Sequence, residues 1–255
     1  MKKCLQWRLW APLVKILKFK SALLSILLAT SPIQANEFWG LESWMNSLKT
    51  PDFEEIKDVN ERKKAFFSYL LPEINKQNSK IVQLRHNIKN NSINKFKLKK
   101  IYQYYHVDEN DMETLLNRVD IIPASLVLAQ GAYESNWGRS RFAKYYHNFF
   151  GLWCFKKGCG IVPLKRNKTA THEVAKFSSL EKSIEYYMRS INRNSAYKTL
   201  REIRKHKRDN QLPVTGISLS EGLENYAEIG YEYVETVQSI IRYNKLSKFD
   251  YDSKS

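Results

Sequence analysis

Residues 123–138 read PASLVLAQGAYESNWG, and this stretch predicts a buried helix. Between Leu126 and Ala132 it has almost no polar face, and a helix that is apolar on all sides belongs inside a protein core. Pro123 suits the first position of such a helix, and Gly138 suits its end. The remaining elements of the fold must therefore pack around this helix.

Helical periodicity continues on both sides of the buried stretch. Residues 60–93 predict one long helix that Pro72 interrupts. Residues 178–192 predict another helix, which opens with a capping box at Ser178. Shorter helices follow toward the C-terminus, and the irregular part of the chain contains a strand or hairpin arm over 169–177. The pattern predicts a mainly α fold with a short β-hairpin.

The first 35 residues have the order of a secretory signal. Residues 1–20 carry six basic residues and no acidic one, residues 21–33 are uncharged, and Ala35 is small enough for cleavage. The apolar stretch is shorter than the roughly 20 residues that span a bilayer. Ile33 is not the small residue that cleavage favours, so an uncleaved membrane anchor is the alternative.

We therefore expect an exported or periplasmic protein, with association with the membrane as the alternative. Its expected parts are a signal peptide over 1–35, a helical extension over 36–115 and a main domain over 116–250. The extension either packs on the main domain or contacts another envelope protein, and both roles are compatible with the sequence.

The chain is strongly basic, with a net charge of +16, of which +10 remains without the six basic residues of the signal. For an exported protein, anionic envelope polymers and lipid headgroups are more plausible partners than nucleic acid. The basic residues from Lys198 to Arg208 are expected to form a solvated helix face, with weak attraction to such a surface as their functional alternative. We expect a monomer.

Two cysteines remain beyond the signal, in the sequence LWCFKKGCG over 152–160. Four residues, including Gly158, separate Cys154 from Cys159, a spacing that suits a short disulfide loop in an oxidising compartment. Two cysteines without a nearby histidine are too few for a zinc site. We expect a structural disulfide, no bound metal and no organic cofactor.

Glu134 is the acidic residue that ends the buried helix, and no other acidic residue lies between Asp120 and Glu173. Apolar neighbours and the negative end of the helix dipole both raise the pKa of a carboxyl group. A carboxyl that stays protonated near neutral pH can act as a general acid toward a glycosidic oxygen. The alternative is a structural carboxylate paired with Arg139 or Arg141.

Aromatic residues crowd into residues 137–153, together with amide side chains. Aromatic faces stack on the apolar faces of sugar rings, and amides bond to hydroxyl and acetamido groups. Some of these rings, such as Phe142 and Phe149, are expected to fill the core instead. The predicted substrate-binding residues of this carbohydrate groove are Gln130, Asn136, Trp137, Asn148, Phe150 and Trp153.

Two motifs carry a resemblance to a known family. LAQGAYESNWG over 128–138 and NFFG over 148–151 resemble the signature of glycoside hydrolase family 73, the endo-β-N-acetylglucosaminidases. The likeness covers residues 118–245. It implies a lysozyme-like α+β domain with a cleft, and cleavage after N-acetylglucosamine in the β-1,4-linked glycan strands of peptidoglycan. The family's catalytic acid falls on Glu134.

The resemblance also implies partners for this acid. The family's second acidic residue, in a mobile hairpin, matches Glu173, which would activate water if the mechanism inverts. Here the hairpin is short, so Glu173 is alternatively an exposed strand residue, and the 2-acetamido group of the substrate is an alternative nucleophile. A tyrosine on a late helix matches Tyr226.

Two rival functions stay open. A lytic transglycosylase is also lysozyme-like, uses one glutamate and leaves an anhydro end on the sugar without a second carboxylate. A non-catalytic scaffold that binds the cell wall could keep the fold and lack the activity.

Overall fold

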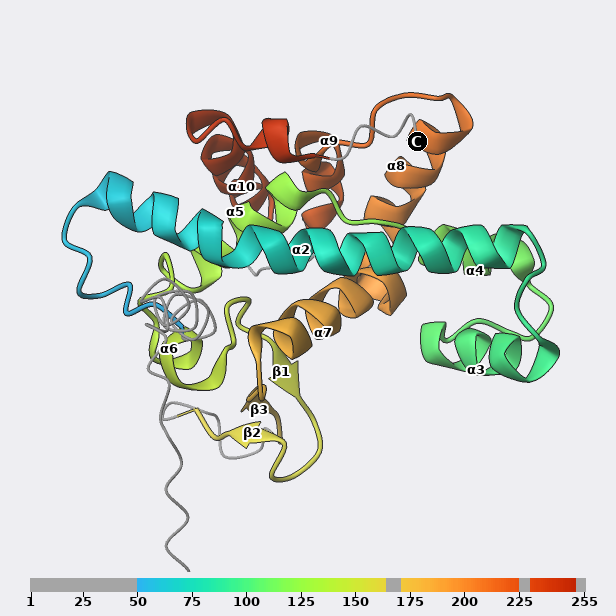
Figure 1. Ribbon diagram of the computed structural model, residues 1–255, viewed down its shortest axis with the longest axis horizontal. Coiled ribbons are helices and arrows are strands. Elements are labelled where there is room, and N and C mark those ends of the chain that lie inside the picture. Colours follow the sequence, from blue (N-terminus) through green and yellow to red (C-terminus); the bar gives the residue numbers. More distant parts are fainter. Residues whose placement is uncertain (1–49, 164–170, 225–229, 251–255) are drawn as a thin grey trace, which may run out of the picture. The chain divides into compact units, whose positions relative to one another are not determined.

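The computed structural model describes residues 50–163, 171–224 and 230–250. Figure 1 shows a chain made mostly of helices, with one small sheet at the lower edge of the view, so the mainly α fold class is confirmed. The expected signal peptide over 1–35 lies outside the described residues.

The α-helices are α2 (Val59–Lys89), α3 (Lys95–Tyr105), α4 (Met112–Arg118), α5 (Ala124–Glu134), α6 (Arg141–Tyr146), α7 (Leu180–Arg193), α8 (Lys198–Asp209), α9 (Gly216–Ser220) and α10 (Tyr231–Tyr243). The strands are β1 (Trp153–Cys154), β2 (Gly160–Ile161) and β3 (Glu173–Ala175), and short 3-10 turns cover Ser195–Tyr197, Glu221–Leu223 and Leu246–Phe249.

Helix α5 is the buried helix that the sequence predicts. Every residue from Ala124 to Ala132 is buried, and α2, α9 and α10 pack against the helix. Pro123 is the residue before the helix rather than its first residue. The carboxylate of Asp250 accepts hydrogen bonds from the Ser125 amide at 2.9 Å and the Gly216 amide at 3.0 Å. One side chain thus satisfies free N–H groups at the starts of α5 and α9.

Helix α2 joins the expected extension to the main domain. It continues through Pro72 and buries Phe66, Leu70 and Ile74. In Figure 1 it runs across the view between α5 and α7, and it packs against both. The described residues belong to one compact unit, in which Phe66, Leu70 and Ile74 share an apolar cluster with the residues of α5. Among the described residues, no helix is long and apolar enough to cross a bilayer.

Helix α7 begins one residue later than predicted. Ser179, not Ser178, is its N-cap, and its side chain accepts a hydrogen bond from the Lys182 amide. Its buried face includes Ile184, Tyr187 and Met188. This face brings the hydroxyl of Tyr187 into the core close to α5.

The β element is a three-stranded antiparallel sheet rather than a simple hairpin. Its order is β1-β3-β2, with Cys154 opposite Glu173 and Gly160 opposite Ala175. A Cβ atom on Gly160 would lie 2.0 Å from the backbone oxygen of Val174, so only glycine permits this close approach. Strand β3 confirms part of the strand expected over 169–177.

Helix α8 corrects the expectation of a fully solvated basic face. Arg201 and Arg204 are buried, with exposed fractions of 4% and 1%. Arg204 reaches toward the buried Asp120, whose carboxylate also accepts a hydrogen bond from Arg208 at 2.9 Å. Sequence periodicity did not reveal this role because the partner carboxylate comes from a distant part of the chain.

Candidate active site

Glu134 lies at the last position of α5, half-buried, where the helix leaves the core. Its Oε1 atom accepts a hydrogen bond of 2.8 Å from the hydroxyl of Tyr233 on α10. Burial raises the pKa of Glu134, and the Tyr233 hydrogen bond offsets only part of that rise. The carboxyl group therefore holds its proton to higher pH than an exposed glutamate does.

The nearby arginines have other partners. Arg139 donates to the backbone oxygen of Asn136 and to the Oδ1 atom of the same residue, at 3.3 and 2.8 Å. The guanidinium of Arg141 lies over the ring of Phe142. In the part of the chain that the structure describes, the predicted alternative of an arginine-paired Glu134 has no support.

Tyr233 is a partner of Glu134 that the sequence did not predict. It is fully buried, and its ring packs edge-on against that of Tyr133, with ring centroids 5.4 Å apart. The available signal was its position on the apolar face of α10, together with Val237 and Ile241. Tyr226, which the family resemblance selected instead, lies outside the described residues.

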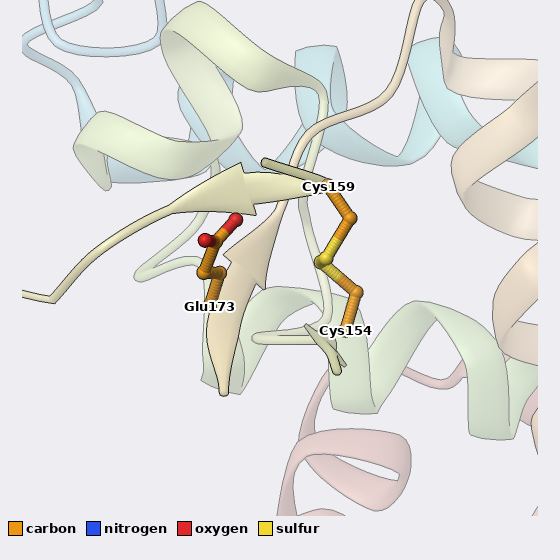
Figure 2. A group of neighbouring side chains, drawn as sticks. All are labelled: Cys154, Cys159 and Glu173. Carbon is orange, nitrogen blue, oxygen red and sulfur yellow. A yellow bond between two sulfur atoms is a disulfide. The ribbon is translucent and has the colours of Figure 1, made fainter. Parts of the chain in front are cut away.

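Glu173 is not the exposed strand residue that the sequence allowed, because only 6% of it is exposed. Its two carboxylate oxygens accept hydrogen bonds from the amides of Gly158, at 3.0 Å, and Gly160, at 2.8 Å. These amides flank Cys159, whose disulfide bond to Cys154 is present as expected. Figure 2 shows the carboxylate and the disulfide on neighbouring strands. Glu173 therefore holds the disulfide loop against β3.

The same three side chains have the composition of a partial metal site. One ligand atom from each of Cys154, Cys159 and Glu173 lies within 4.8 Å of the others. However, the two sulfur atoms are bonded to each other, and a disulfide offers no thiolate ligand. In this oxidised form the three side chains stabilise the loop.

Three predicted substrate-binding residues are buried and bonded within the protein. Gln130 accepts from the hydroxyl of Tyr187 and donates to that of Tyr233 at 3.0 Å. The Asn148 side chain donates to the backbone oxygens of Leu152 and Ala175, which ties the loop to β3. Phe150 stacks on Tyr187, with ring centroids 4.1 Å apart. Their burial and internal bonds favour a role in shaping the site, and direct contact with substrate stays a prediction.

The other three predicted residues reach the surface. Trp153 is 51% exposed and stacks on His172, with ring centroids 4.0 Å apart. Trp137 is half-buried, and the Nζ atom of Lys63 lies 5.0 Å from its ring centroid. Asn136 is exposed beside Glu134 in the chain. Each of the three side chains therefore retains some exposed surface, and their contact with sugar stays a prediction.

Replacing Glu173 with glutamine is expected to loosen the disulfide loop. The glutamine NH2 group would replace one acceptor and face a backbone N–H, which leaves a buried donor unsatisfied at a cost of about 1–3 kcal/mol. Trypsin should then cut faster after Lys156 and Lys157, which are exposed in this loop. Gel analysis of timed digests measures this rate.

The matched control is Glu202→Gln, an exposed glutamate on α8, which should leave the digestion pattern unchanged. A Glu173→Gln variant with wild-type trypsin sensitivity, but with activity lost as completely as in Glu134→Gln, would contradict the structural role. That result would instead identify Glu173 as the base.

Comparison with known proteins identifies the family of the chain. A family model described as Mannosyl-glycoprotein endo-beta-N-acetylglucosaminidase matches residues 109–246. The chain belongs to this glucosaminidase family and is, by class, a glycoside hydrolase. The resemblance drawn from residues 128–138 and 148–151 is thereby confirmed.

Particular relatives extend the comparison beyond the family model. The chain is similar to Protein bax of Escherichia coli (strain K12), with 31% identity over 204 residues, which covers 74% of this chain and 73% of that protein. Among solved structures, the catalytic domain of the autolysin Auto from Listeria monocytogenes gives a TM-score of 0.46 at 18% identity. That match covers 86% of this chain and 100% of the other.

Proposed function

We propose that this chain is an exported endo-β-N-acetylglucosaminidase that cleaves the glycan strands of peptidoglycan, with Glu134 as its general acid. The observation that carries the proposal is the half-buried Glu134 carboxyl at the end of α5, whose pKa is raised by burial. A group of this kind is protonated at a pH where an exposed glutamate is ionised. It also occupies the acidic position of the family motif.

In the proposed reaction, Glu134 gives its proton to the glycosidic oxygen. The bond from that oxygen to the anomeric carbon breaks, its electron pair stays on the oxygen, and water completes the hydrolysis at the anomeric carbon. Trp137 and Trp153 offer exposed ring surface to the sugars. Tyr226 remains a proposed contact across the cleft.

The nucleophile is proposed to be the substrate's own 2-acetamido group. Both oxygens of Glu173 accept backbone hydrogen bonds. These bonds favour a structural role for the carboxylate over the activation of water. The same observation favours a second candidate, a lytic transglycosylase, in which a hydroxyl of the sugar attacks. Neither route requires a second carboxylate.

Digestion of purified sacculi followed by mass spectrometry distinguishes these reactions. The proposed glucosaminidase releases fragments with reducing N-acetylglucosamine ends. Fragments that end in 1,6-anhydro-muramic acid would instead establish the transglycosylase. Binding to sacculi without release of fragments, by the wild type and Glu134→Gln alike, would support the non-catalytic scaffold.

Export and envelope attraction belong to the same proposal. The basic net charge of the chain favours contact with anionic wall polymer or lipid headgroups, an attraction that salt weakens. We propose a periplasmic, monomeric enzyme. Sequencing the N-terminus of the protein recovered from the periplasm would test cleavage after Ala35.

A further inference from the structure

A continuous chain of hydrogen bonds runs through the core to Glu134. The Tyr187 hydroxyl on α7 donates to Oε1 of Gln130 on α5. The Nε2 atom of Gln130 donates to the Tyr233 hydroxyl at 3.0 Å, and that hydroxyl donates to Oε1 of Glu134 at 2.8 Å. Three helices thus contribute one polar group each behind the acid.

The chain of polar groups lies where apolar side chains would be expected. Tyr187, Gln130 and Tyr233 are each 0% exposed. Polar groups buried in this way lower stability unless they are hydrogen-bonded. Burial also raises the pKa of Tyr187 well above its usual value, so its phenol keeps the proton that it donates to Gln130. The Tyr187 hydroxyl is thus the donor at the far end of the chain of hydrogen bonds.

The hydrogen bond from Tyr187 to Gln130 sets the direction of the two later bonds. Because Tyr187 donates to the amide oxygen of Gln130, the amide NH2 group faces Tyr233. The Tyr233 oxygen accepts from this NH2 group, so its single hydrogen is directed to Glu134. If the amide were turned around, its oxygen would compete for that hydrogen.

The direction of these bonds distinguishes the two oxygens of the acid. Oε1 of Glu134 accepts from Tyr233, whereas Oε2 faces the backbone of Gly151. A Cβ atom on Gly151 would lie 3.2 Å from Oε2, so glycine keeps side-chain atoms away from this oxygen. An acceptor role for Oε1 leaves Oε2 as the oxygen that carries the proton.

We propose that Tyr187 and Gln130 are positioning residues that direct the Tyr233 hydroxyl to Oε1 and thereby place the catalytic proton of Glu134 on Oε2. This inference rests on the proposed function of Glu134 as the acid. Neither residue touches the substrate, and both act through the orientation of Tyr233.

The test is the pH dependence of turnover in a Tyr187→Phe variant. Loss of the Tyr187 hydroxyl lets the Gln130 amide turn and take the Tyr233 hydrogen bond away from Glu134. We expect kcat on soluble peptidoglycan strands to fall about 10-fold, less than the roughly 10²–10⁴ that a general acid contributes. KM should stay close to that of the wild type. The alkaline limb of the profile should move to higher pH, because the Tyr233 hydrogen bond lowers the pKa of Glu134.

A double variant distinguishes an effect on the direction of the Tyr233 hydrogen bond from an effect on the stability of the fold. In Tyr187→Phe with Gln130→Met, residue 130 has no oxygen to compete for the Tyr233 hydroxyl. The alkaline limb should therefore return toward that of the wild type, although the core has lost more polar contacts. A merely structural role predicts a double variant no closer to the wild type than Tyr187→Phe, and that result would overturn the inference.

Tyr105→Phe is the matched control, since it removes the hydroxyl of a buried tyrosine on α3, within the separate apolar cluster of α3, α4 and the end of α2. Its kcat and pH profile should equal those of the wild type. If Glu134→Gln stays active, the proposed function itself fails. If Glu134→Gln is inactive but Tyr187→Phe keeps the wild-type profile, only the positioning role fails.

Discussion

Replacement of Glu134 with glutamine is expected to lower the rate of peptidoglycan digestion by roughly 10²–10⁴-fold, the usual contribution of a general acid. Glutamine keeps an oxygen that can accept from the Tyr233 hydroxyl, so the geometry behind the site is preserved. It has no proton of suitable acidity for the glycosidic oxygen. Release of soluble fragments from purified sacculi measures the loss. Glu202→Gln on α8 is the control and should digest sacculi at the wild-type rate.

The same variant should not be less stable than the wild type at neutral pH. The pKa of Glu134 is raised in the folded protein, so folding favours the protonated form. Ionisation above this pKa therefore costs stability, and the neutral glutamine avoids that cost. Thermal unfolding at pH 7 should give an equal or higher Tm. If the folded Glu134→Gln protein digested sacculi as fast as the wild type, Glu134 would not be the general acid.

Local sequence was sufficient to predict the position of Glu134 and the structural features nearest to it. The run from Leu126 to Ala132 is apolar on every side, and this pattern alone predicted that α5 is buried and that Glu134 ends it. The disulfide was likewise predicted from the spacing of Cys154 and Cys159, because only a short loop separates them. Each prediction depended on residues close together in the chain.

The remaining parts of the site depend on contacts between distant segments. Gln130 was predicted to bind substrate as one of the amides of the groove, and the structure adds that Tyr187 and Tyr233 reach it from α7 and α10. The sequence does not show which polar residue meets an inward-facing partner 57 or 103 positions away. The hydrogen bonds of Asn148 were not predicted for the same reason, since strand β3 supplies one of its acceptors.

Replacement of Arg204 with methionine is expected to destabilise the fold by about 3–5 kcal/mol, the usual result of removing one partner from a buried ion pair. Arg204 donates to the backbone oxygens of Ile121 and Asn117 and to the side chain of Asn192, each at 2.8 Å. Methionine fills similar space but satisfies none of these acceptors. Thermal unfolding should show Tm lower by roughly 10 °C, given about 2–4 °C per kcal/mol for a domain of this size.

The pH dependence of this loss identifies its electrostatic part. Burial alone would raise the pKa of Asp120, but Arg204, Arg85 and Arg208 outweigh that effect and hold it below the usual value. A carboxylate with a lowered pKa contributes stability above its unfolded pKa and loses it as the pH falls through the folded one. Without Arg204, Asp120 is less costly to bury when protonated, so the variant should lose more stability at pH 7 than at pH 4. An equal loss at both pH values would mean that hydrogen bonds and packing, rather than charge, account for the effect. Lys198→Met, an exposed change on the same helix, should alter stability by no more than about 0.5 kcal/mol.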